Sequence, residues 1–125
     1  MISYNPIYSI LCIDESEQNL ESFKSDFGQD YHVYTATSDR DGMKIMEEKT
    51  IQLVITDQRI PDISGIEFLE KVMAGYPDCM RIIMTGTGDR DAIIEAINRG
   101  IIFRYVAKPW NREDLKMSID NAMEF

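Results

Sequence analysis

The stretch from Leu53 to Gly65 constrains the fold more than any other part of this sequence. Its first four residues, Leu-Val-Ile-Thr, are apolar or β-branched and show no alternation with polar side chains. Such a run is typical of a strand buried on both faces, as at the centre of a parallel sheet. Asp57 follows directly, and Pro61 and Gly65 mark the loop behind it. Because the functional groups of open α/β sheets gather beyond the carboxyl ends of the strands, we expect Asp57 to be the reactive group.

Short apolar runs alternate with amphipathic helical segments along the rest of the chain. The sequence predicts strands at residues 7–13, 32–37, 53–56, 81–84 and 105–107, and helices at 16–28, 38–49, 64–75, 89–99 and from about 112 to the end. This alternation predicts an α/β fold, with parallel strands joined by right-handed crossovers and helices on both faces. We expect one domain over residues 1–125, a doubly wound, flavodoxin-like (βα)5 sheet with strand order 2-1-3-4-5.

Helical spacing also predicts which residues face the core. Those expected to point inward are Leu20, Phe23, Phe27, Ile45, Met46, Ile66, Leu69, Met73, Ile93, Ala96, Ile97, Leu115, Ile119 and Ala122. Ser16 is placed to cap the first helix and Gly28 to end it. The second strand is more polar than the others, and we therefore expect it at an edge of the sheet. Trp110 is expected to pack at the base of the last helix or to serve a partner surface.

Four of the five predicted strands end in a chemically useful residue. These residues are Asp14 with Glu15, Asp57, Thr85 and Lys108, and parallel strands would carry them to one edge of the sheet. Three carboxylates in one cleft repel one another, and a hard divalent cation such as Mg²⁺ would relieve that repulsion. A carboxylate can attack phosphorus, while an ammonium and a hydroxyl stabilise the transferring phosphoryl group. This group of residues therefore predicts phosphoryl transfer to Asp57.

Composition excludes several other classes. The formal net charge of −9 argues against direct nucleic-acid binding, which needs clustered Lys and Arg. No apolar run approaches the roughly 20 residues that span a bilayer, so we expect no membrane association. His32 is the only histidine, which leaves no material for a histidine-based metal site or a Ser-His-Asp triad. Cys12 and Cys79 are typical of reduced, incidental thiols in a cytoplasmic protein.

The order and spacing of these residues resemble the receiver domain of two-component response regulators, of the chemotaxis-regulator-like type. The residues that carry the resemblance are the pair Asp14-Glu15, Asp57 with Pro61 and Gly65, Thr85, and the run from Tyr105 through Lys108 to Pro109. The resemblance covers essentially the whole chain. It implies a phosphorylation-activated signalling switch, not a turnover enzyme, in which Asp57 accepts a phosphoryl group from a histidine kinase or a phosphotransfer protein.

The resemblance also implies a metal site. Mg²⁺ would be held by Glu15, Asp57 and the backbone carbonyl of Arg59, with Asp14 assisting through water. The acidic pair is commonly Asp-Asp in this family, whereas here its second member is Glu15, which is one methylene longer. This difference makes Glu15 the position at which the metal-binding set departs from the family pattern.

Further roles follow from the same resemblance. Thr85 and Lys108 would contact the phosphoryl oxygens, and Tyr105 would follow Thr85 when the protein is activated. The face formed by the fourth helix, the fifth strand and the fifth helix would then change and dock an output domain or partner, with a homodimer as one possible result. The Lys108–Pro109 bond is expected to be cis. Arg59 and Thr87 would set the lifetime of the phosphorylated state.

Other interpretations stay open at the level of sequence. A phosphohydrolase with an aspartyl intermediate would want a second carboxylate two residues after Asp57, where Arg59 stands. A flavin-binding module would need a phosphate loop after the first strand, and the Asp14-Glu15 pair would repel the phosphate. A receiver-like interaction domain that never accepts phosphate is a further alternative. The segment 86–88 lacks a phosphate-loop fingerprint and is predicted to be a hinge.

Overall fold

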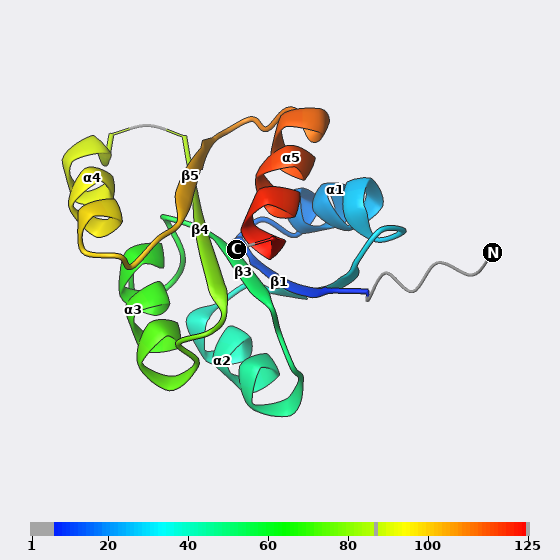
Figure 1. Cartoon of the computed structure of the whole chain (residues 1–125), viewed down its shortest axis with the longest axis horizontal. Helices are drawn as coiled ribbons and strands as arrows, with labels where there is room; N and C mark the ends of the chain where they lie inside the picture. Colours follow the sequence, from blue (N-terminus) through cyan, green and yellow to red (C-terminus); the bar gives the residue numbers. More distant parts are fainter. Residues whose placement is uncertain (1–6, 87, 125) are drawn as a thin grey trace.

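The computed structural model describes residues 7–86 and 88–124. The strands are β1 (Ser9–Ile13), β2 (His32–Ala36), β3 (Leu53–Asp57), β4 (Met80–Thr85) and β5 (Arg104–Ala107). The helices are α1 (Glu17–Phe27), α2 (Asp39–Glu48), α3 (Gly65–Gly75), α4 (Arg90–Asn98) and α5 (Arg112–Met123). Strands and helices alternate along the whole described chain, as Figure 1 shows.

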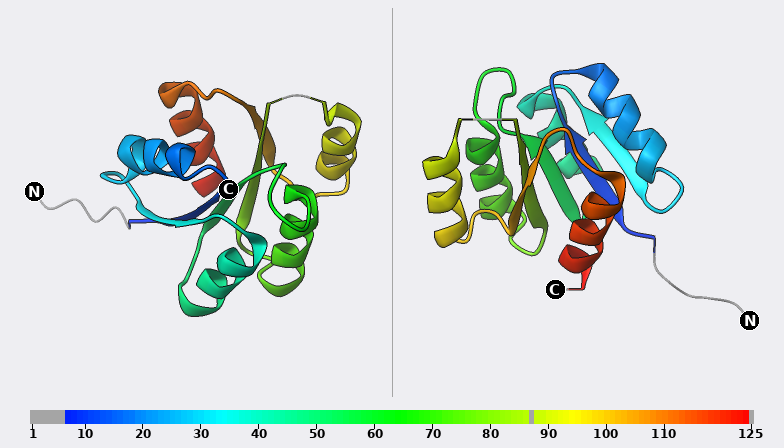
Figure 2. Two further views of the ribbon diagram at one scale, coloured as in Figure 1. Left: turned by 180° about the vertical axis from the view of Figure 1, so that it is seen from behind. Right: turned by 90° about the horizontal axis from the view of Figure 1, so that it is seen from above.

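The five strands form one sheet in which every pairing is parallel and the order is β2-β1-β3-β4-β5. Both the α/β class and the predicted strand order are therefore confirmed. Apolar side chains of α1 and α5 form one core with the sheet, and those of α2, α3 and α4 form a second core on the other face. Figure 2 shows these two layers of helices on either side of the sheet. The order brings the ends of β1 and β3 together at the switch point.

Most of the local predictions are confirmed. β2 lies at an edge of the sheet, and Ser16 caps α1 by accepting a hydrogen bond from the Asn19 backbone N–H. The prediction that Ile97 faces the core was wrong. Ile97 is 37% exposed, because only Ile93 and Ala96 of α4 reach the core. Helical spacing is compatible with a buried or an exposed Ile97. The side chain is exposed because α4 packs loosely on the sheet.

The apolar stripe of α3 is also rotated from the predicted one. Phe68, Leu69 and Val72 are fully buried, whereas Ile66 and Met73 flank the core and are partly buried.

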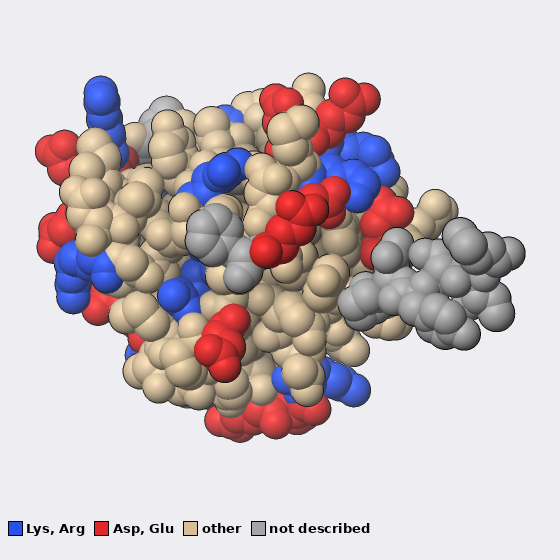
Figure 3. All heavy atoms as spheres, in the orientation of Figure 1, with Lys and Arg blue, Asp and Glu red and all other residues tan. Residues whose placement is uncertain are grey.

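No helix in the described part of the chain is long and apolar enough to cross a bilayer. On the face seen in Figure 3, Lys and Arg side chains are scattered among acidic ones, and this face therefore offers no extended basic surface.

Candidate functional site

Three strand ends meet at one point of the sheet edge. Asp14 follows β1, Asp57 ends β3, and Lys108 follows β5. The Lys108 Nζ donates to Asp14 Oδ2 at 2.7 Å and to Asp57 Oδ2 at 3.2 Å. The parallel topology thus brings together residues from three distant segments, as the sequence predicted. Direct contact joins two predicted carboxylates and one predicted ammonium.

Asp14 is 1% exposed, and the protein satisfies both of its carboxylate oxygens. Its Oδ1 accepts the backbone N–H of Ser16 at 2.9 Å, and its Oδ2 accepts Asn19 Nδ2 at 3.2 Å as well as the Lys108 ammonium. A buried carboxylate needs such partners because an unpaired one costs several kcal/mol. Sequence reasoning missed Asn19. The signal for it was its place in the first turn of the helix that follows Asp14.

A tight turn holds Asp57 at the end of β3. Gly65 closes this turn by donating its N–H to the Gln58 carbonyl at 2.9 Å. A Cβ at Gly65 would lie 2.4 Å from the Asp57 carbonyl oxygen, and so only glycine allows α3 to begin this close to the strand end. The Gln58 Oε1 accepts the N–H of Ile66 at 3.0 Å, which fixes the start of α3 from the other side. No pattern in the sequence indicated this role of Gln58.

The Lys108 ammonium is held in its charged form. Burial acts to lower the pKa of Lys108, but the hydrogen bonds and charges of Asp14 and Asp57 outweigh burial and raise that pKa. The backbone N–H of Lys108 also bonds to the Thr85 carbonyl at 2.9 Å, which ties the residue to the end of β4. The Lys108–Pro109 bond is cis, as predicted.

Thr85 and Tyr105 lie beside this cluster. Together with residues from the start of α4 they line a cavity of about 500 Å³. Tyr105 is 52% exposed, so about half of the residue is in contact with solvent. Thr85 therefore sits at the predicted edge of the sheet, and Tyr105 shares its cavity. In the described part of the chain, however, the Thr85 side chain forms no hydrogen bond with Asp14, Asp57 or Lys108.

The predicted trio of acids is only partly assembled. Among residues 7–86 and 88–124, no three His, Cys, Asp or Glu side chains lie together in a group that could hold a metal ion. Glu15 is exposed, and Lys108 bridges the other two acids. The donor chemistry nevertheless suits a hard divalent cation, because every side-chain donor is a carboxylate oxygen. The two carboxylates and the one ammonium that are in contact have a formal charge of −1, which leaves negative charge for a cation to neutralise.

Two other predicted residues lie in the surrounding loops. Arg59 is exposed and forms an isolated antiparallel bridge with Ser64, which fixes its backbone within the Asp57 loop. Thr87, predicted to affect the lifetime of a phosphorylated state, lies outside the described residues.

Comparison with known proteins gives consistent results. The family model named response regulator receiver domain matches residues 10–120. A response regulator receiver domain protein from Clostridium thermocellum has the same fold with a TM-score of 0.88 and 36% identity, covering 94% of this chain and 95% of that one. The signal receiver domain of an HD domain-containing protein from Pseudomonas fluorescens gives a TM-score of 0.89 and 27% identity, covering 99% of this chain and 92% of that one.

Curated relatives are longer proteins. The hydrogenase transcriptional regulatory protein HoxA of Cupriavidus necator is 26% identical over 116 residues, which are 93% of this chain and 24% of HoxA. The regulatory protein LuxO of Vibrio vulnificus is 31% identical over 84 residues, which are 67% of this chain and 18% of LuxO. The chain thus spans less than a quarter of the length of these relatives.

Proposed function

Because this chain belongs to the response regulator receiver domain family, whose members act as phosphorylation-activated signalling switches, we propose that its phosphoacceptor is Asp57. The donor would be the phosphohistidine of a histidine kinase or of a phosphotransfer protein. The observation that carries this proposal is the contact of Lys108 with both Asp14 and Asp57 at the meeting point of three strand ends. It puts a fixed positive charge next to the carboxylate that would receive the phosphoryl group.

The proposed transfer needs few parts from the protein. An Asp57 carboxylate oxygen forms the new bond to phosphorus, and the bond between phosphorus and the donor imidazole breaks. The electron pair of the broken bond leaves with the imidazole nitrogen. No proton has to be removed from Asp57, because the attacking group is a carboxylate. Lys108 stabilises the negative charge on the phosphoryl oxygens, and the raised pKa of its ammonium keeps it charged. Thr85 adds a hydroxyl donor once it turns toward the group.

Mg²⁺ fits this site by charge and donor type. Glu15, Asp57 and the Arg59 carbonyl would hold it, with Asp14 assisting through water. The ion would supply neutralisation of charge on the phosphoryl oxygens. Asp14 keeps its role as the buried partner of Lys108, since its two oxygens already accept three hydrogen bonds from the chain.

The response would pass to the face formed by α4, β5 and α5. Thr85 and Tyr105 line one cavity at this face, and Tyr105 is 52% exposed, so solvent lies on one side of it. Phosphorylation adds negative charge in a confined pocket and so biases an element with two arrangements. We propose that a cytoplasmic output domain or partner, or a second copy of the chain, reads this face. Arg59 and Thr87 would set how long the state lasts.

Phosphorylation by a small acyl phosphate such as acetyl phosphate, in the presence of Mg²⁺, tests the proposal. We expect one phosphoryl group per chain by intact-mass analysis, and none in Asp57→Asn. Asp62→Asn is the matched control, because Asp62 lies exposed in the same loop with a positive φ of 74° that asparagine also adopts. Equal phosphorylation of Asp57→Asn and the native chain, with the variant still folded, would reject Asp57 as the acceptor.

The same experiment separates a second candidate function. An aspartyl-phosphate phosphohydrolase would turn over a phosphate ester continuously, whereas a switch is modified once. Arg59 stands where such a hydrolase would need its second carboxylate, and its backbone is held by the bridge to Ser64. With a phosphate monoester as donor, we therefore expect the switch to release no more than about one equivalent of alcohol within the lifetime of the phosphorylated state, whereas a hydrolase would release alcohol and inorganic phosphate continuously.

A further inference from the structure

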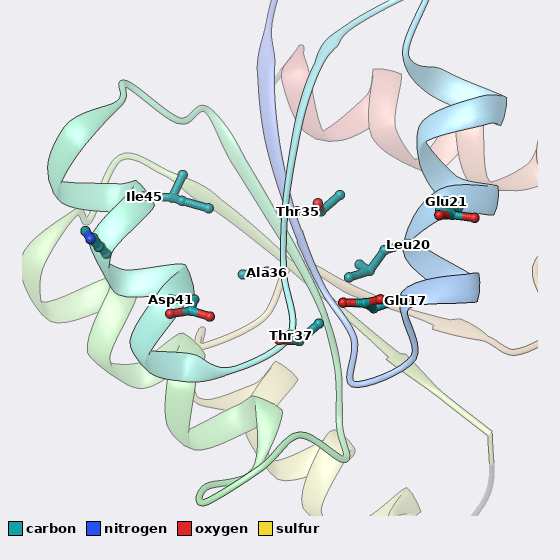
Figure 4. A pocket seen from close by; sticks show the side chains of 9 residues that line it. Glu17, Leu20, Glu21, Thr35, Ala36, Thr37, Asp41 and Ile45 are labelled. Carbon is teal, nitrogen blue, oxygen red and sulfur yellow. The ribbon is translucent and has the colours of Figure 1, made fainter.

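A groove lies over the β2 edge of the sheet, between α1 and α2. Its volume is about 550 Å³, and it is lined by residues of all three elements. Figure 4 shows the end of β2 running between the two helices, with side chains of α1 on one side and of α2 on the other. None of the residues to which we assign phosphoryl transfer lines it. The groove therefore has no explanation in the proposed function.

The backbone of β2 leaves this edge open. In the described part of the chain β2 pairs with β1 alone. His32 donates its N–H to the Tyr8 carbonyl, and Ala36 accepts from Asp14, so the even-numbered residues of β2 face β1. Backbone groups alternate in direction along a strand, and those of Val33 and Thr35 therefore point outward. An unpaired edge of this kind accepts an extended chain by main-chain hydrogen bonds.

The groove offers side-chain contacts on both sides of that edge. Leu20 of α1 and Ala36 of β2 line the groove as buried apolar residues, and Ile45 of α2 is a partly buried one. Leu20 belongs to the core on one face of the sheet and Ala36 to the core on the other. Because an added strand sends alternate side chains to opposite faces, it would have apolar contacts on each face.

Charge decides which segment fits. Glu17, Glu21 and Asp41 line the groove against a single cation, Lys44. None of these three acids takes part in the ion pairs formed within the described residues. A second copy of the chain would bring the same acidic side chains to the interface, and nucleic acid would add phosphates, so like charges oppose both occupants. A basic segment instead complements the groove.

We propose that the β2 edge and its acidic groove bind an extended, basic polypeptide segment of a partner protein as an added strand. The interaction would not require Asp57 to be phosphorylated, since the groove contains none of the residues assigned to that chemistry. The site is thus separate from the face formed by α4, β5 and α5, on the opposite edge of the sheet.

A capped peptide of alternating Lys and Val tests the proposal with the whole chain, and an otherwise identical peptide of Glu and Val serves as its control. We expect NMR titration with the Lys peptide to shift the amides of Val33, Thr35 and Thr37, with weaker binding at higher salt. The triple variant Glu17→Gln, Glu21→Gln, Asp41→Asn should bind at least about tenfold more weakly, a difference of about 1.4 kcal/mol. The control variant Glu47→Gln, Glu48→Gln, Glu124→Gln removes the same charge elsewhere and should bind normally.

A second arm tests strand addition without altering the protein. A Lys-Val peptide N-methylated at every residue keeps its charge but loses its main-chain donors along both edges, and it should fail to bind. The proposal is overturned if the methylated peptide binds equally well, if the control variant loses as much affinity as the triple variant, or if the amide shifts fall outside residues 33–37.

Discussion

Helices α1 and α4 flank the candidate site, and they are anchored in opposite ways. The Ser16 hydroxyl caps α1, which buries Leu20, Phe23 and Phe27 against the sheet. In α4, the N-cap Asp89 forms no side-chain capping bond, and only two residues of the helix are buried. Two large apolar residues of α4, Ile94 and Ile97, are instead 45% and 37% exposed.

Polar contacts extend the difference. Trp110 Nε1 donates to Asp26 Oδ2 at 3.0 Å and its ring packs edge-on against Phe23, so α1 is joined to the segment leading into α5. At α4, Arg81 Nε donates to the Ile101 carbonyl at 2.7 Å and Arg81 Nη2 to the Gly100 carbonyl at 3.3 Å, just beyond the end of the helix. α4 is thus fixed at its C-terminal end and lightly held at the end near Thr85. One wall of the site is rigid, and the other is suited to move.

The largest expected effect comes from truncating one apolar side chain in each helix. Phe23→Ala should lower the free energy of unfolding by about 3–5 kcal/mol, because Phe23 is fully buried between the sheet and Trp110. Ile97→Ala should cost less than about 0.5 kcal/mol, since the side chain is already partly in water. Urea unfolding measures both values. Similar losses in the two variants would contradict the claim that α4 is lightly packed.

Arg81 gives the next test, at the fixed end of α4. Arg81→Met removes the guanidinium that bonds the carbonyls of Cys79, Gly100 and Ile101, and we expect a loss of about 1.5–3 kcal/mol. Hydrogen exchange should quicken around Ile101 while α1 stays protected. The control is Arg99→Met, because Arg99 forms only long surface ion pairs that are worth little. Equal exchange in both variants would show that Arg81 does not fix this end.

The sequence predicted the firmly packed side of the molecule better than the lightly packed side. Alternating apolar runs identify the strands, and parallel topology then brings Asp14, Asp57 and Lys108 together without further information. Arg81 could not be found in this way, because its partners are backbone carbonyls and leave no pattern of residue types. Ile97 failed for a related reason: helical spacing gives the direction of a side chain but not how closely its helix packs. Glu15 follows Asp14 directly but is exposed, because the side chains of neighbouring residues point in different directions.

Helix capping gives a smaller effect. Ser16→Ala removes the acceptor for the Asn19 N–H and should cost about 1 kcal/mol. Asp89→Ala removes no capping bond, so we expect less than about 0.5 kcal/mol, the remainder being the favourable charge at the helix start. Thermal unfolding of the two variants makes the comparison. A larger loss for Asp89→Ala would mean that the start of α4 is held as firmly as that of α1.

The smallest expected effect on stability is a pH dependence at α5, which lies beside α1. Tyr31 donates to Asp120 Oδ1 of α5 and accepts from Lys116 Nζ at 3.2 Å. Burial, and then the Asp120 carboxylate, raise the pKa of Tyr31 to about 12 from its ordinary value near 10. A raised pKa favours the protonated form in the folded chain. The stabilisation is therefore complete below about pH 10 and is lost as pH rises toward about 12.

Tyr31→Phe isolates this contribution. The native chain should be more stable than the variant at pH 8, by less than about 1 kcal/mol because Asp120 and Lys116 are partly exposed, and the difference should vanish between about pH 10 and 12. The Cys79 thiol, whose pKa burial raises to about 11, is present in both proteins and cancels in the comparison. The hydrogen-exchange protection factors of α5, which correct for the base-catalysed rise of the intrinsic rate, should fall over the same pH range in the native chain only, while those of α4 change alike in both. A difference between the two proteins that persists unchanged to pH 12 would mean that the Tyr31 hydroxyl does not help to anchor α5.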